Sequence, residues 1–88
     1  MDIKYFANYW TARKYAEKRG LVEQEYGDCY GSDISYVSYN KTGSKDDESE
    51  VTVYYTWELN EDGHYRPAKK ASRAFKDTLK HLYGIIIK

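Results

Sequence analysis

The stretch from Pro67 to Gly84 constrains the fold more than any other part of this sequence. Pro67 is typical of a first helical position, and Gly84 is typical of the left-handed residue just past a helix end. The apolar and small residues between them recur at three- and four-residue steps: Ala71, Ala74, Phe75, Thr78, Leu79 and Leu82. This spacing predicts a helix over 67–84 that packs along one side on another element.

A second helix is expected near the N-terminus. Asp2 is a suitable N-cap, and Gly20 is suited to end the helix after Arg19. The apolar residues of this stretch cover a wide arc: Ile3, Phe6, Ala7, Tyr9, Trp10, Ala12 and Ala16. An apolar arc of this width favours contact with both a sheet and the other helix.

Strands are expected between the two helices. The clearest is 51–59, where apolar and polar residues alternate, so that Val51, Val53, Tyr55, Trp57 and Leu59 share one face. A second strand is expected over 33–40, and residues 21–26 could form a third, followed by an irregular turn between Gly27 and Gly31. Residues 41–50 read as a polar loop and 60–63 as a turn.

The expected architecture is therefore a two-layer α+β fold over 1–88, a single domain. Its order is a helix, two or three antiparallel strands and a helix, with both helices packed on one face of a small meander sheet. Val53, Tyr55 and Trp57 would then face residues of both helices, namely Phe6, Trp10, Phe75, Leu79 and Leu82.

Residue types exclude several functional classes. Cys29 is the one cysteine among 88 residues, so no internal disulfide can form, a buried thiol is expected, and a reducing cytoplasm fits best. Cys29, His64 and His81 lack the paired spacing of a metal site, so no metal or cofactor is expected.

No apolar run approaches the ~20 residues of a membrane span. His64 beside Asp62 or Glu61 is the one acid–base candidate, in a turn without a nucleophile, so no enzyme is expected.

Charge is balanced in total and divided along the chain. Residues 1–20 carry five cations and two acids, residues 21–65 carry two cations and eleven acids, and residues 66–88 carry seven cations and one acid. The ends are thus basic and the middle is acidic. The composition includes 11 Tyr, which supply contact area and a polar hydroxyl.

These features favour a small non-enzymatic protein-binding module or inhibitor, which engages a basic partner protein through an acidic, Tyr-rich sheet and loop surface. In type it is similar to small phage-encoded inhibitors of host or defence proteins. The residues expected at the contact are Tyr54, Glu58, Asp46, Asp47, Glu48 and Glu50, with Tyr36 and Tyr39 as alternates that depend on strand register.

Two alternatives use the basic ends of the chain. The first is a nucleic-acid-binding protein whose cations face the phosphates, namely Lys69, Arg73, Lys76 and Lys80, with Arg13 and Lys14 in support. The second is a homo-oligomer in which the basic helices of one copy meet the acidic sheet of another. That assembly is compatible with either function.

Overall fold

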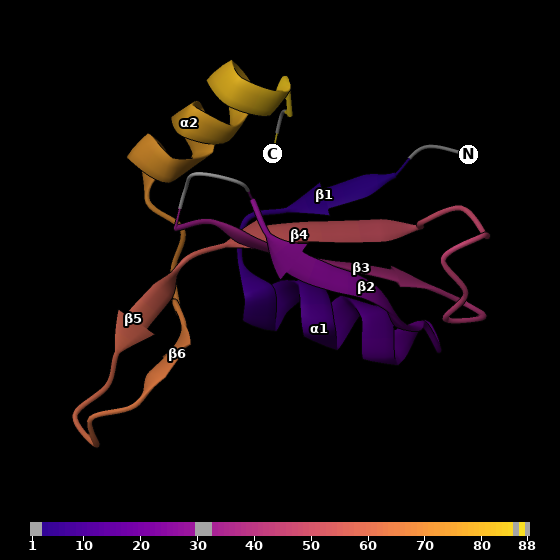
Figure 1. Cartoon of the computed structure of the whole chain (residues 1–88), viewed down its shortest axis with the longest axis horizontal. Coiled ribbons are helices and arrows are strands. Elements are labelled where there is room, and N and C mark those ends of the chain that lie inside the picture. Colours follow the sequence, from indigo (N-terminus) through magenta and orange to yellow (C-terminus); the bar gives the residue numbers. More distant parts are fainter. Residues whose placement is uncertain (1–2, 30–32, 86, 88) are drawn as a thin grey trace.

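The computed structural model describes residues 3–29, 33–85 and 87, and these form a small α+β fold (Figure 1). It contains two helices, a mixed four-stranded sheet and a separate two-stranded sheet. In chain order the elements are β1 (Lys4–Phe6), α1 (Tyr9–Lys18), β2 (Val22–Asp28), β3 (Ser35–Asn40), β4 (Val51–Tyr55), β5 (Trp57–Leu59), β6 (Tyr65–Pro67) and α2 (Arg73–Tyr83).

The chain enters the fold as a strand, so the prediction of a helix from Asp2 is wrong at its start. Residues Lys4–Phe6 pair in parallel with β4, and the larger sheet has the order β1-β4-β3-β2. The helix begins only after Asn8, whose side-chain oxygen accepts a hydrogen bond from the Thr11 amide at 3.0 Å. Pairing with β4 satisfies backbone groups of β1, which explains the extended conformation. Asp2 itself lies outside the described residues.

One face of the sheet is covered by α1, as predicted for the first helix. Ala12 and Ala16 are 0% and 1% exposed, and these small side chains let the helix approach the sheet closely. They pack in one cluster with buried residues of β3 and β4 and of the turn after the helix: Leu21, Val37, Tyr39, Val51, Val53 and Tyr55. The alternation that predicted the inward face of 51–55 is confirmed.

The predicted strand 51–59 is interrupted at Thr56. Beyond it, β5 pairs with β6 in a separate hairpin whose turn contains Gly63 at φ 84°, as the sequence indicated. The Thr56 carbonyl accepts a hydrogen bond from the Ala68 amide at 2.8 Å, which links the residue after β6 to the residue that separates β4 from β5. Pro67 lies in β6 opposite Trp57, so the prediction that Pro67 opens the last helix is wrong.

The last helix is shorter than expected at its start and ends where expected. It begins after Ser72, whose hydroxyl accepts a hydrogen bond from the Phe75 amide at 3.0 Å. It ends at Gly84, which has φ 67° as a left-handed cap. The helix cannot start at Pro67, because residues 65–67 are already paired in the hairpin.

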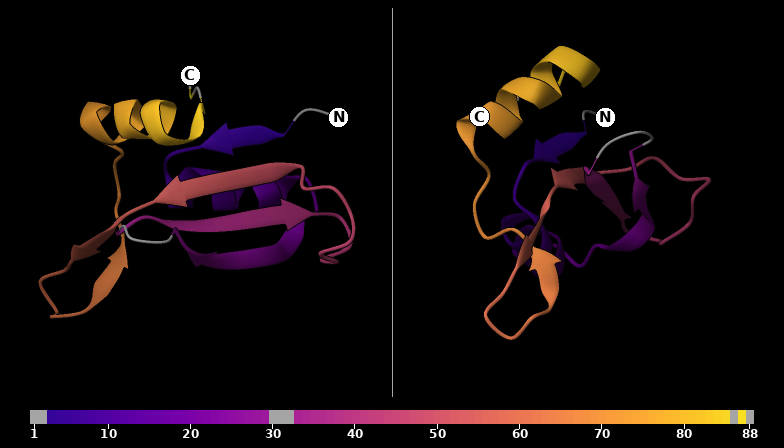
Figure 2. Two further views of the ribbon diagram at one scale, coloured as in Figure 1. Left: turned by 45° about the horizontal axis from the view of Figure 1, so that its top comes forward. Right: turned by 60° about the vertical axis from the view of Figure 1, so that its left-hand side comes forward.

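The two helices lie on opposite faces of the larger sheet, so the prediction of both helices on one face is wrong (Figures 1 and 2). Alternation along β4 places Tyr54 on the face opposite Val53, and Tyr54 stacks on Tyr83 of α2 with ring centroids 5.5 Å apart. Leu79 packs with Ala7 and Ile34 in a second cluster. The first face is already filled by α1, so α2 packs on the opposite face, which we call the tyrosine face because Tyr5, Tyr36 and Tyr54 gather there.

Three residues that were expected in a core between both helices and the sheet therefore lie outside such a core: Trp57, Leu82 and Trp10. Trp57 belongs to the hairpin and is 47% exposed, and Leu82 is 63% exposed on α2. Trp10 donates its indole N–H to the Pro67 carbonyl at 3.0 Å, which holds the base of the hairpin against α1.

Candidate functional site

The acids of the 41–50 loop lie at one end of the larger sheet. Asp46, Asp47 and Glu48 are exposed and Glu50 is half-buried. The loop is held to β2 by the Gln24 side-chain amide, which donates to the carbonyls of Ser44 at 3.0 Å and Asp47 at 2.6 Å. The loop backbone that carries these carboxylates is therefore tied to β2, and the carboxylates form an acidic patch.

Glu58 lies at the other end of the molecule, because β4 separates the loop from the hairpin (Figure 1). Its carboxylate accepts a hydrogen bond from the Lys69 amide at 3.3 Å. Tyr54 lies between the two ends and is half-buried beneath α2. The structure therefore does not bring Tyr54, Glu58 and the loop acids together in one surface.

Tyr54 is part of a tyrosine cluster on the sheet face opposite α1. Its ring centroid lies 6.4 Å from that of Tyr5, 6.3 Å from Tyr36 and 5.5 Å from Tyr83. Burial raises the pKa of the Tyr54 hydroxyl, with Cys29 and the neighbouring tyrosines adding to the effect. Tyr39, the other alternate contact residue, is 6% exposed on the α1 face. The cluster contacts α2 through the ring of Tyr83.

The cations of the alternative hypothesis are exposed. Arg73, Lys76 and Lys80 follow one another along α2, whereas Lys69 precedes the helix. Arg13 and Lys14 are exposed on α1, which lies on the opposite face of the sheet from α2. The structure therefore divides the predicted basic residues between two faces.

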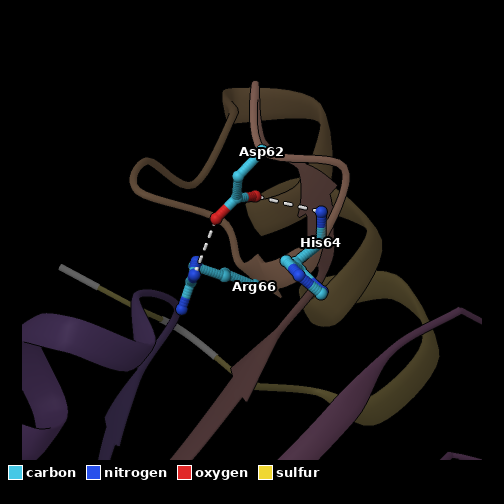
Figure 3. Close-up of polar contacts among 3 residues, drawn as sticks. All are labelled: Asp62, His64 and Arg66. Carbon is cyan, nitrogen blue, oxygen red and sulfur yellow. Dashed lines mark hydrogen bonds and ion pairs between the residues drawn. The ribbon is translucent and has the colours of Figure 1, made fainter.

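The His64 and Asp62 pair does not form an acid–base dyad in this geometry. Asp62 accepts hydrogen bonds from the His64 backbone amide at 3.0 Å and from the Arg66 guanidinium at 2.9 Å (Figure 3). The hydrogen bond from Arg66 is the main cause that lowers the pKa of the Asp62 carboxyl, and the His64 amide adds to it. The bond from His64 is made by the backbone, and it stabilises the turn.

A hollow lies between the hairpin and the end of the larger sheet. We call it the hairpin groove, and it has a volume of about 640 Å³. Its lining comes from three parts of the chain: Asp28, Asp33, Ser35, Thr56, Trp57 and Tyr65. It shares Asp28, Ser35 and Trp57 with a second hollow of about 330 Å³, whose lining also includes Tyr26. The lining combines carboxylates with aromatic rings, as binding pockets commonly do.

A chain of hydrogen bonds fixes the floor of the hairpin groove. The Trp57 indole N–H donates to the Ser35 hydroxyl at 2.9 Å, and that hydroxyl donates to an Asp28 carboxylate oxygen at 2.6 Å. Ser35 is 3% exposed, so the central member of this chain is shielded from water. The indole ring and the carboxylate are thus held in fixed positions before any ligand arrives.

The hairpin presents two different faces. Directly opposed residues share a face, so Trp57 and Leu59 lie with Pro67 and Tyr65, while Glu58 lies with Arg66 on the other side. Leu59 and Tyr65 are 60% and 67% exposed. An exposed apolar face beside a groove is typical of a binding surface.

The residues of the hairpin groove were not identified from the sequence. The alternation of 51–55 continues through Trp57 and predicts a core position for it, and the glycines around Asp28 predict an irregular turn. Asp33, Ser35 and Tyr65 carry no local pattern that links them. Only the break after Tyr55, which turns the hairpin toward β2 and β3, brings them together.

Within the described residues, no group of three or more histidine, cysteine, aspartate or glutamate side chains is arranged to hold a metal ion. Neither α1 nor α2, the helices of the described part of the chain, is long and apolar enough to cross a membrane. Comparisons of the chain with protein-family models, with curated proteins and with solved structures gave no significant match.

Proposed function

We propose that this protein is a non-enzymatic binding module that engages a basic partner protein through the hairpin groove. The observation that carries the proposal is the groove lining, in which the described residues supply two carboxylates and two large aromatic rings and no lysine or arginine. Aromatic side chains supply most of the energy at the centre of interfaces, and complementary charge selects the partner.

The acidic patch of the 41–50 loop has a secondary role in this proposal. Asp46, Asp47 and Glu48 are exposed at the far end of the sheet from the groove, so a partner bound at the groove does not have to touch them. Exposed acids accelerate the encounter with a basic protein without adding much to the lifetime of the complex. Such a module would act as an inhibitor of a partner whose basic surface normally holds nucleic acid, because binding at the groove would block that surface.

The proposal places the protein in a reducing cytoplasm. Cys29 is the one cysteine of the sequence, which leaves no disulfide to form within the chain.

Two charge-reversal variants test the proposal. Asp28→Lys with Asp33→Lys alters the groove, and Asp46→Lys with Glu48→Lys is the matched control, since each pair changes net charge equally. Partners are captured from a nuclease-treated lysate, identified, purified and measured by surface plasmon resonance. The groove variant is expected to lose binding of the basic partner. The loop variant is expected to retain it, with slower association by about tenfold or less at low salt.

Retention of the same partner by the groove variant would refute the proposal. The nucleic-acid-binding alternative is supported if the unmodified protein binds duplex or single-stranded nucleic acid with a steep salt dependence. The same binding should then be lost when Lys69, Arg73, Lys76 and Lys80 are changed to Glu. Gel filtration at low and high salt shows whether the partner is a second copy of this chain.

A further inference from the structure

We propose that the hairpin groove receives an arginine side chain of the partner, an inference that rests on the proposed function. The guanidinium would lie against the ring of Trp57 or Tyr65 and donate hydrogen bonds to the carboxylates of Asp28 and Asp33. The groove volume of about 640 Å³ leaves room for one long side chain and its flanking backbone.

The fixed position of Trp57 is the first argument. Its indole N–H already donates to the Ser35 hydroxyl at 2.9 Å, so the N–H is not available to a ligand. The residue is 47% exposed, and the exposed part of the ring presents its π surface. A guanidinium stacks on an aromatic surface of this kind and is attracted by its quadrupole. Because the ring is already held, little side-chain entropy is lost when a ligand binds.

The charge of the lining is the second argument. Asp28 and Asp33 line the same groove, and none of the described residues that line it is a lysine or arginine. The nearby cation Arg66 lies on the other face of the hairpin and pairs with Asp62 at 2.9 Å. A cation from outside the chain therefore meets two carboxylates that no described lysine or arginine of the groove lining neutralises.

Arginine fits this combination better than lysine. A guanidinium is planar, is weakly hydrated and can hydrogen-bond to a carboxylate through two N–H groups while its plane stacks on a ring. A lysine ammonium is a strongly hydrated point charge, and it loses more hydration when it enters a groove walled by aromatic rings.

The test follows the two indole N–H signals of the ¹⁵N-labelled full chain by NMR, with Trp57→Phe used for their assignment. The probes are three acetylated, amidated tripeptides, glycine-X-glycine, in which X is arginine, lysine or the neutral arginine analogue citrulline. The arginine peptide is expected to shift the Trp57 signal saturably, with Kd on the order of 1 mM, and to leave the Trp10 signal in place. The lysine peptide is expected to bind about threefold or more weakly, and citrulline not measurably.

Isosteric variants complete the test. Asp28→Asn and Asp33→Asn are each expected to weaken arginine binding by about threefold or more, while Glu61→Gln on the hairpin turn is the control that leaves it unchanged. The full ¹⁵N spectrum verifies that each variant is folded. Equal shifts of Trp10 and Trp57, or equal affinity for the three peptides, would overturn the arginine inference. If the peptides fail while capture of the basic partner still depends on Asp28 and Asp33, the arginine inference falls and the proposed function stands.

Discussion

Replacement of Leu79 by alanine is expected to lower the free energy of unfolding by about 2–5 kcal/mol, because it removes a fully buried side chain and leaves a cavity. Leu79 is 0% exposed and is the one buried residue of α2. It packs with Ala7 and Ile34, which makes it the main anchor of the helix on the tyrosine face of the sheet. For a domain of this size the loss is a large part of the total stability.

Leu82→Ala is the matched control for this substitution. Leu82 lies three residues further along α2 but is 63% exposed, so its truncation is expected to change the free energy of unfolding by less than about 0.5 kcal/mol. Urea denaturation followed by circular dichroism measures both variants. Hydrogen exchange of residues 73–83 shows whether Leu79→Ala releases α2 alone. Equal effects of the two substitutions would contradict the packing of α2 described above.

The contrast between Leu79 and Leu82 shows what the three- and four-residue spacing can predict about burial and what it cannot. The spacing predicted that one side of 67–84 is apolar, and Gly84 marked its end correctly. It could not show which part of that apolar side is covered, because coverage depends on the surface that α2 meets. That surface is the ring of Tyr54 with Ala7 and Ile34, and these residues lie far from α2 in the sequence.

Pairing between distant segments explains the other errors. The strand β1 has three residues and pairs in parallel with β4, so the local sequence carries no alternation long enough to separate it from a helix. The alternation of 51–59 was real on both sides of Thr56, but it could not reveal that the chain changes sheets there. The hairpin groove results from that change of sheet, so its residues could not be grouped from the sequence.

The fold is expected to lose stability steeply between pH 10 and pH 12. Burial is the main cause that raises the pKa of both Tyr39 and Tyr55 to about 12, from an ordinary value of 10.0. The unfolded chain therefore releases these two protons at lower pH than the folded chain does. A raised folded-state pKa gives a contribution that is fully present below pH 10 and is lost as the pH rises through 12. The loss approaches about 2–3 kcal/mol for each tyrosine.

Tyrosinate absorbance and circular dichroism, measured together in a pH titration, check this expectation. The unfolding transition should coincide with ionisation of the last tyrosines. Tyr39→Phe is expected to reduce the fall in stability between pH 10 and pH 12 by about half, since one of the two buried hydroxyls is then absent. Tyr26→Phe, at a residue that is 74% exposed, is the control and should leave the alkaline transition unchanged. Because Tyr39 and Tyr55 lie in the cluster that α1 covers, a protein whose tyrosines all ionise near pH 10 while it stays folded would contradict the burial of that cluster.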